Sequence, residues 1–513
     1  MRCYFLKSRK SIINAVFSLV STVVLSALSL ISTNLILKCY GSDFNGVVAT
    51  ASQVITILLL LEGGITTATN FALYKPYVDG DYKKINAILT KTAKQFFKIG
   101  LLLFTIGFFI ALFYPFFIKS ELPYIDIMLI ILMVICSTTF NIIFTTKYNV
   151  LFQASQNEYY LTICNFVSNI LTYIITIILV LNKANMLLVR LNITVGTIVN
   201  GIFVYLIFKK KFPLANYKSK VQNIHYYGLK DIIIQKFTGV VYSTAPIMFI
   251  SSFVGTVYSS VYSVYNSIFS IVKTVAYSIV SAPSNGFGQM FSSNDNQRNI
   301  YNKFVLYQLI VTMILSILIA SVLSVIIPFM QLYTRNVTDV NYIDYLLAFL
   351  FSLTLYVEII HCPAGTIIGV AGHFKSGKNI QLIAISCLVP LLFIGALLFK
   401  VYGIMLSVLL TGVLLAWLEI YYVHTKIFHE KIEPVLKIVF LNFILLLIEF
   451  LFWYVLDLKF DNYFIFLVKG GVVLIVNAIF NLIVNKIFFS LMFDEIVKMV
   501  KNLFVNIPEK NSL

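Results

Sequence analysis

The chain has 513 residues, of which 59% are hydrophobic, 15% aromatic and only 12% charged. A soluble domain carries about twice that share of charge, so the composition excludes a soluble enzyme or binding domain and indicates a polytopic membrane protein. The net charge of +17 does not indicate nucleic-acid binding, because the basic residues lie in short loops between apolar segments. Six cysteines show no CxxC motif and no metal-binding spacing with histidine, so we predict no disulfide framework, metal or cofactor.

Apolar runs of about 20 residues, the length that spans a bilayer as a helix, recur along the whole chain. A basic N-terminal segment precedes the first run, which is too long for a signal peptide and is interpreted as a retained helix. The pattern predicts fourteen helices, near residues 13–37, 46–73, 96–117, 126–146, 161–181, 187–208, 231–253, 256–282, 305–327, 345–370, 381–399, 403–422, 435–456 and 463–485.

The distribution of Lys and Arg predicts the orientation of these helices. With the N-terminus in the cytoplasm, the predicted cytoplasmic segments hold 27 basic residues and the outer loops hold 6. Such an excess follows the positive-inside rule and requires an even number of helices. We therefore expect both termini in the cytoplasm.

A weak internal repeat with a spacing near 215 residues divides the chain. LYKPYVDGDYKKINAIL corresponds to MFSSNDNQRNIYNKF, and LFQASQNEYY to IIGVAGHFKSGKN. Two bundles in parallel repeat are typical of transporters with a cavity between the halves. The predicted organisation is an N-terminal six-helix bundle (1–208), a basic cytoplasmic linker (209–230), a C-terminal six-helix bundle (231–422), two additional helices (435–485) and a cytoplasmic interfacial tail (486–513).

This organisation resembles the polysaccharide flippases. The segments LLLLEGGITTATNFALYKPYVDGDYKKINAIL and LFQASQNEYY are similar to the Wzx-type oligosaccharide flippases of the MATE-like (MOP) superfamily. The resemblance implies two bundles that alternate between inward and outward opening in a bacterial cytoplasmic membrane. It implies an undecaprenyl-diphosphate-linked oligosaccharide as substrate, moved to the outer leaflet for surface polysaccharide synthesis. Membrane lipids, a polysaccharide polymerase and assembly proteins are the expected partners.

The predicted helix 256–282 carries a polar stripe that includes Asn266, Ser270, Lys273 and Tyr277. These residues fall on one face at 100° per residue, and a lysine in a membrane helix is costly unless it faces protein or water. The stripe therefore predicts the wall of a polar cavity, with Lys273 binding the diphosphate of the carrier. The alternative is a structural lysine bonded to a neighbouring helix.

Three further ionisable residues within the spans are candidates for binding or gating. Lys236 is predicted in the inner half of the bilayer and could also bind diphosphate, with snorkelling to the interface as the alternative. Arg190 lies near the outer end of its helix, either snorkelling or helping the diphosphate leave. Glu62 and Lys273 have matching predicted depth, so Glu62 could pair with Lys273 in one state or take up a proton. A static structural pair is the alternative.

Two pairs complete the candidate residues. Glu358 and His361 lie at i,i+3 and could form a proton relay or a satisfied polar contact. Glu449 and Lys469 lie at similar predicted depth on consecutive helices, so we expect an ion pair that clamps these helices together.

We interpret the chain as a lipid-linked oligosaccharide flippase without covalent chemistry. A lipid II-type flippase and a cation-coupled drug exporter of the same superfamily are the alternatives within transport. The lysine in the stripe favours an anionic headgroup over a cationic drug, and the first predicted helix lacks the arginines implied for a lipid II flippase. A membrane enzyme or a scaffold of polysaccharide assembly are alternatives of another class, although the outer loops are too short for an acceptor domain.

Overall fold

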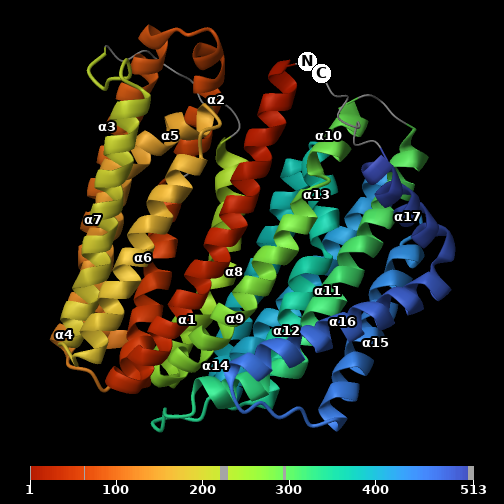
Figure 1. Ribbon diagram of the computed structural model, residues 1–513. Coiled ribbons are helices and arrows are strands. Elements are labelled where there is room, and N and C mark those ends of the chain that lie inside the picture. Colours follow the sequence, from red (N-terminus) through yellow and green to blue (C-terminus); the bar gives the residue numbers. More distant parts are fainter. Residues whose placement is uncertain (1, 63, 220–228, 293–295, 506–513) are drawn as a thin grey trace. The chain divides into compact units, whose positions relative to one another are not determined.

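The computed structural model describes residues 2–62, 64–219, 229–292 and 296–505. Within these ranges the chain is nearly all helical and has no strand (Figure 1). Eleven helices of this part of the chain are long and apolar enough to cross a membrane. The predicted fold class, an all-α polytopic membrane protein, is confirmed. The count of fourteen and the cytoplasmic location of both termini stay predictions.

Two of the longest of these helices each contain a break. Helix α1 (Arg2–Leu58) is kinked at Gly41, where φ is 81°. Helix α14 (Phe374–Tyr422) is kinked at Lys400, where φ is 52°. In both cases the break falls between two helices that the sequence predicts separately. Helix α9 (Thr256–Ser281) has 26 residues, close to its predicted bounds, but its polar stripe keeps it outside the eleven.

The chain divides into two compact units, which we describe separately. The first contains Met1–Val264, Asn336–Val340 and Ala396–Val401. The division falls inside α9 and not at the predicted linker 209–230, and the predicted pair of six-helix bundles stays a prediction. The helices of the first unit besides the start of α9 are α1, α2 (Ile65–Val78), α3 (Tyr82–Phe113), α4 (Tyr124–Phe140), α5 (Lys147–Ala154), α6 (Tyr159–Leu181), α7 (Met186–Lys211) and α8 (Leu229–Phe249).

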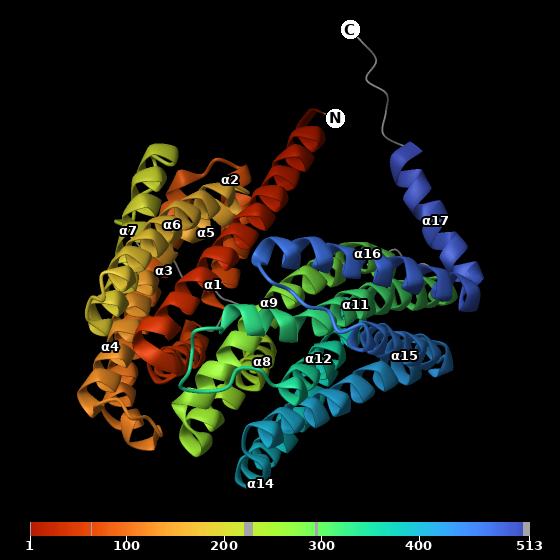
Figure 2. The same cartoon turned by 60° about the horizontal axis from the view of Figure 1, so that its bottom comes forward.

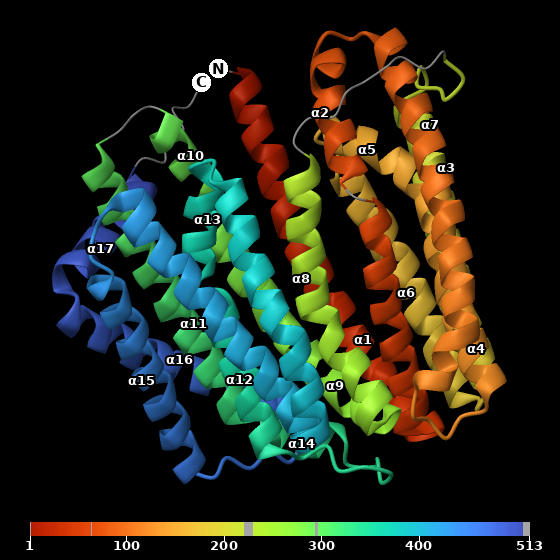
Figure 3. The ribbon, with the colours of Figure 1, turned by 180° about the vertical axis from the view of Figure 1, so that it is seen from behind.

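Large apolar side chains form the core of the first unit. Helix α6 packs against α1 and α7, and α3 packs against α4 (Figures 1 and 3). Phe44, Phe96, Ile130 and Phe152 come from four different helices and are fully buried in this core. Between membrane helices, close packing of this kind supplies dispersion energy that lipid tails do not replace.

A carboxylate after the kink of α1 ties several segments of the first unit together. Asp43 accepts hydrogen bonds from the Thr256 hydroxyl at the start of α9 and from Ser120 Oγ and Glu121 N, each of the last two at 2.8 Å. Gly46, about one turn later in α1, lies against the same first turn of α9. A Cβ atom on Gly46 would lie 1.8 Å from the Thr256 carbonyl oxygen, so only glycine lets α1 and α9 approach this closely.

The second unit contains Tyr265–Arg335, Asn341–Gly395 and Tyr402–Leu513. Helix α17 lies in the predicted tail, whose interfacial location stays a prediction and whose residues 506–513 are outside the described ranges. The helices of this unit besides α9 and α14 are α10 (Ser284–Ser292), α11 (Gln297–Tyr333), α12 (Tyr345–Ile360), α13 (Cys362–Val370), α15 (Glu433–Val455), α16 (Tyr463–Phe488) and α17 (Ser490–Val505).

Helix α11 is the central element of the second unit, and α15 and α16 pack on it (Figure 2). Buried polar side chains line the contact between these three helices, and we call this set the polar seam. They hydrogen-bond one another across the helices, as for Asn477 Nδ2 to Ser321 Oγ at 3.0 Å and Asn442 Nδ2 to Asn485 Oδ1 at 3.1 Å. The members of the polar seam are Ser316 and Ser321 on α11, Asn442 and Glu449 on α15, and Asn477, Asn481 and Asn485 on α16.

Candidate functional site

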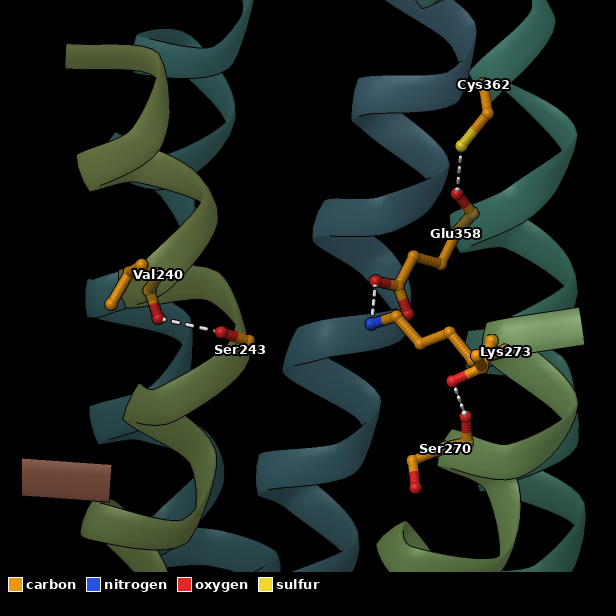
Figure 4. A network of polar contacts seen from close by, with 7 residues as sticks. Val240, Ser243, Ser270, Lys273, Glu358 and Cys362 are labelled. Atoms are coloured by element: carbon orange, nitrogen blue, oxygen red, sulfur yellow. Dashed lines mark hydrogen bonds and ion pairs between the residues drawn. The ribbon is translucent and has the colours of Figure 1, made fainter. Parts of the chain in front are cut away.

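The polar stripe of α9 is present, but its lysine is not free. Asn266, Ser270 and Tyr277 are exposed, whereas the Lys273 side chain is only 33% exposed. Lys273 Nζ donates to the carboxylate of Glu358 on α12, whose side chain is 18% exposed (Figure 4). The Tyr277 ring adds a cation–π contact at 5.8 Å from Nζ. In this state Lys273 is therefore a structural lysine bonded to a neighbouring helix, and its binding of phosphate stays a prediction.

Glu358 and His361 do not pair with each other, as a direct relay would require. Instead, the Nδ1–H of His361 donates to Glu419 Oε2 of α14 at 2.8 Å. His361 lies at the break between α12 and α13, where Pro363 occupies the first turn of α13. Gly365 leaves room for the new partner, because a Cβ there would lie 2.9 Å from Glu419 Oε2.

The two ion pairs form one cluster, since Glu358 acts electrostatically on His361 as well as on Lys273. We call Lys273, Glu358, His361 and Glu419 the α9–α14 cluster. It carries one net negative charge when the imidazole is neutral and no net charge when His361 is protonated. An uncompensated negative charge is costly inside a helical bundle. A proton on His361 or a cation beside the carboxylates would remove the net charge of the cluster.

A second candidate lies in the first unit, where a pocket of about 350 Å³ contains both Glu62 and Lys236. Glu62 accepts a hydrogen bond from the Thr66 hydroxyl, one turn away. Lys236 is exposed and forms no ion pair with any described residue. Glu62 and Lys273 belong to different units, so their pairing in one state stays a prediction. The pocket is lined by Thr56, Leu59, Leu60, Glu62, Gly64, Thr66, Lys236, Gly239 and Val240.

Arg190 on α7 is buried rather than snorkelling to a surface. It is only 8% exposed, and its Nε has no hydrogen-bond partner among the described residues. The snorkelling interpretation is therefore wrong for this state, and a role in releasing diphosphate stays a prediction.

The predicted ion pair between Glu449 and Lys469 is also wrong. Lys469 Nζ donates to the Lys459 carbonyl at 2.8 Å and lies 5.6 Å from the Phe460 ring centroid. Glu449 is 3% exposed and faces the polar seam, where its neighbour is Asn481. Lys469 and Glu449 therefore have different neighbours and do not form an ion pair.

Sequence reasoning missed two groups. Glu419 stands alone as an acidic residue in a long apolar stretch, a signal that marks it as a candidate in the same way as Glu62. Asn477, Asn481 and Asn485 recur every four residues, which places three amides on one face of an otherwise apolar helix.

Comparison with known proteins shows what the fold of this chain is similar to. No family model and no curated protein matches the sequence. The structure is similar to the lipid II flippase MurJ in an inward closed conformation, with a TM-score of 0.63 and 16% identity over 93% of this chain and 99% of MurJ. It is similar to an inward-facing multidrug resistance MATE family transporter of the MOP superfamily, with a TM-score of 0.64 and 12% identity over 80% of this chain and 95% of that chain.

A third similar structure is the eukaryotic MATE transporter AtDTX14, with a TM-score of 0.58 and 15% identity over 86% of this chain and 99% of that chain. All three proteins are transporters, and each is covered almost completely. At these identities the likeness concerns the fold. The chain therefore has the multi-helical membrane fold shared by the lipid II flippase MurJ and the MATE transporters.

Proposed function

We propose that this chain is a flippase in a bacterial cytoplasmic membrane, moving an undecaprenyl-diphosphate-linked oligosaccharide from the inner to the outer leaflet by alternating access. The observation that carries the proposal is the free ammonium group of Lys236 in the pocket of the first unit. A lysine is a compact point charge suited to phosphate oxygens. The fold shared with a lipid flippase supports the same substrate class.

In this proposal Lys236 receives the diphosphate, and Glu62 returns the pocket to neutrality once the substrate has left. Lys273 becomes available to phosphate only when Glu358 releases it, for example when a proton on His361 alters the charge balance of the α9–α14 cluster. No covalent step is involved. The polymerase and assembly proteins expected as partners belong to the same proposal.

The α9–α14 cluster favours a second function, a cation-coupled drug exporter. It places two carboxylates and a histidine beside a single lysine, and carboxylates are the groups that hold organic cations. A lipid II-type flippase is the third candidate, supported by the likeness to MurJ. The three functions differ in substrate, so one set of strains separates them.

The experiment is complementation of three bacterial strains with the full-length chain. One lacks its oligosaccharide flippase, one is depleted of its lipid II flippase and one lacks its drug exporters. We expect surface polysaccharide to return in the first strain alone. Growth restored in the second strain, or drug resistance in the third without polysaccharide in the first, would replace the proposed substrate.

Lys236→Ala tests the observation that carries the proposal. A charge-assisted contact of about 1.5–3 kcal/mol is lost, which corresponds to about 10- to 100-fold weaker substrate binding. Lys236→Arg should retain part of the export because it keeps the charge. The matched control is Lys98→Ala, which removes an exposed lysine from α3, away from the pocket. Equal export by Lys236→Ala and Lys98→Ala at equal membrane abundance would remove Lys236 from the mechanism.

A further inference from the structure

The polar seam of the second unit contains one group that its hydrogen bonds do not satisfy. Glu449 lies on the buried face of α15 and is 3% exposed. Neither of its carboxylate oxygens has a hydrogen-bond partner among the described residues. The other seam side chains are hydrogen-bonded, and the Asn481 amide is the polar group beside Glu449, without a hydrogen bond of normal geometry between them.

Ionised Glu449 would be a bare anion in a low-dielectric contact between membrane helices, a state with a large desolvation penalty. The described structure provides no charge to compensate it. Lys469, its expected partner, is bonded to the Lys459 carbonyl instead. Tyr356 of α12, which also packs on α15, donates its hydroxyl to the Val439 carbonyl at 2.8 Å. The seam residues on α11 and α16 are serines and asparagines, which do not titrate.

A metal cation is a poor occupant because the surrounding amide oxygens are already in use. Asn477 Oδ1 accepts from Trp453 Nε1 at 2.7 Å, and Asn481 Oδ1 accepts from Asn485 Nδ2 at 2.8 Å. A metal ion requires several oxygen ligands at once, whereas a proton requires one. A proton also converts the carboxylate into a neutral acid with an O–H donor for the seam.

The seam reaches a pocket through which a proton can exchange. A pocket of about 450 Å³ is lined by residues of α11, α12 and α15, including Phe450 and Trp453, which follow Glu449 by one and four positions. Trp453 closes the seam on this side through its bond to Asn477. Asp457 and Lys459, an exposed ion pair with Oδ2 and Nζ 3.5 Å apart, also line this pocket.

From this geometry we propose that Glu449 is a proton-binding site, protonated in the described state and exchanging its proton through the pocket beside Trp453. The reaction is the association of one proton with one carboxylate, and no other reactant takes part. Glu449 shares no residue with the α9–α14 cluster or with the Glu62–Lys236 pocket, so the proposal does not depend on the proposed substrate. It gives the transporter an additional group that takes up or releases a proton.

Infrared difference spectroscopy of the purified full-length chain in lipid nanodiscs tests the proposal. The wild type at neutral pH should show the carbonyl stretch of a protonated, buried carboxylic acid, shifted on transfer to heavy water. Glu449→Gln should lack this band completely, and alkaline pH should remove it from the wild type. The control is Glu433→Gln, on the same helix, whose carboxylate is 63% exposed and paired with Lys437. Its spectrum should keep the acid band.

At neutral pH the spectra of the wild type and of Glu449→Gln are compared. If the substitution removes only the bands of an ionised carboxylate, Glu449 is ionised in the wild type and the proposal is overturned. Thermal unfolding provides the second measurement. A neutral glutamine resembles a neutral acid in shape and hydrogen bonding, so Glu449→Gln should unfold at the wild-type temperature. Unfolding of Glu449→Gln well below the wild type, with Glu433→Gln unchanged, would also contradict it.

Discussion

The pairing of Lys273 with Glu358 allows its structural and functional roles to be separated by a double-mutant cycle. Lys273→Met and Glu358→Gln each leave the other charge uncompensated in the bundle. Exposed ion pairs are worth about 0.2–1 kcal/mol, and breaking a fully buried pair costs about 3–5 kcal/mol. With side chains 33% and 18% exposed, the pair lies between these limits. We expect a coupling energy of about 2 kcal/mol.

The assay is thermal unfolding of the four purified proteins in detergent. Each single variant should unfold about 4 °C or less below the wild type, since 1 kcal/mol shifts a large domain by only about 2–4 °C and less in a longer chain. The double variant should recover part of that loss. The control cycle uses Lys437 and Glu433, whose side chains are 67% and 63% exposed and whose coupling should not exceed about 0.5 kcal/mol. Effects of Lys273→Met and Glu358→Gln that add to within about 0.5 kcal/mol would refute the pairing argument.

The same double variant is a better test of transport than a single substitution. It removes the ammonium group together with its carboxylate partner and leaves the net charge of the α9–α14 cluster unchanged, so membrane abundance should be near that of the wild type. If Lys273 binds diphosphate in another state, surface polysaccharide should be lost although the protein is abundant. Normal export by the double variant would restrict Lys273 to a structural role.

Two further substitutions test the packing of each unit. Gly46→Ala should destabilise the chain by about 3 kcal/mol because its Cβ would overlap the Thr256 carbonyl, whereas Gly470→Ala, with no atom within 4 Å, should be neutral in the same melting assay. Trp453→Phe should lower the unfolding temperature by removing the donor to Asn477 Oδ1, a loss of about 1 kcal/mol; an unchanged melting curve would show that the indole bond contributes nothing.

The sequence predicted the fold class and most helices because a bilayer imposes length and apolarity directly on the chain. It also predicted the bounds and polar face of α9, since a helix places its residues at a fixed angle around one axis. The non-helical residues Gly41 and Lys400 lie where the sequence predicts one helix to end and the next to begin, so these boundaries could also be predicted.

The partners of the charged residues could not be predicted in the same way. Matching depth suggested two pairs. Glu449 and Lys469 do not pair, whereas a pairing of Glu62 with Lys273, which lie in different units, stays a prediction. Depth fixes the height of a residue in the membrane, whereas pairing also requires the rotation and the neighbours of each helix. Lys273 pairs with Glu358, a residue 85 positions later.

The amides of α16 have a consequence for how the chain is synthesised. A helix with three asparagines on one face is unfavourable in lipid until other helices accept the hydrogen bonds of these side chains. Helices α11 and α15, which carry the accepting Ser316, Ser321 and Asn442, emerge from the ribosome before α16 does. The order of translation therefore matches the order in which the bonds can form. When α16 enters the membrane, the helices that carry the acceptors of its amides have already been made. A permuted chain in which α16 is made first would have to hold those amides in lipid until the rest of the protein arrived.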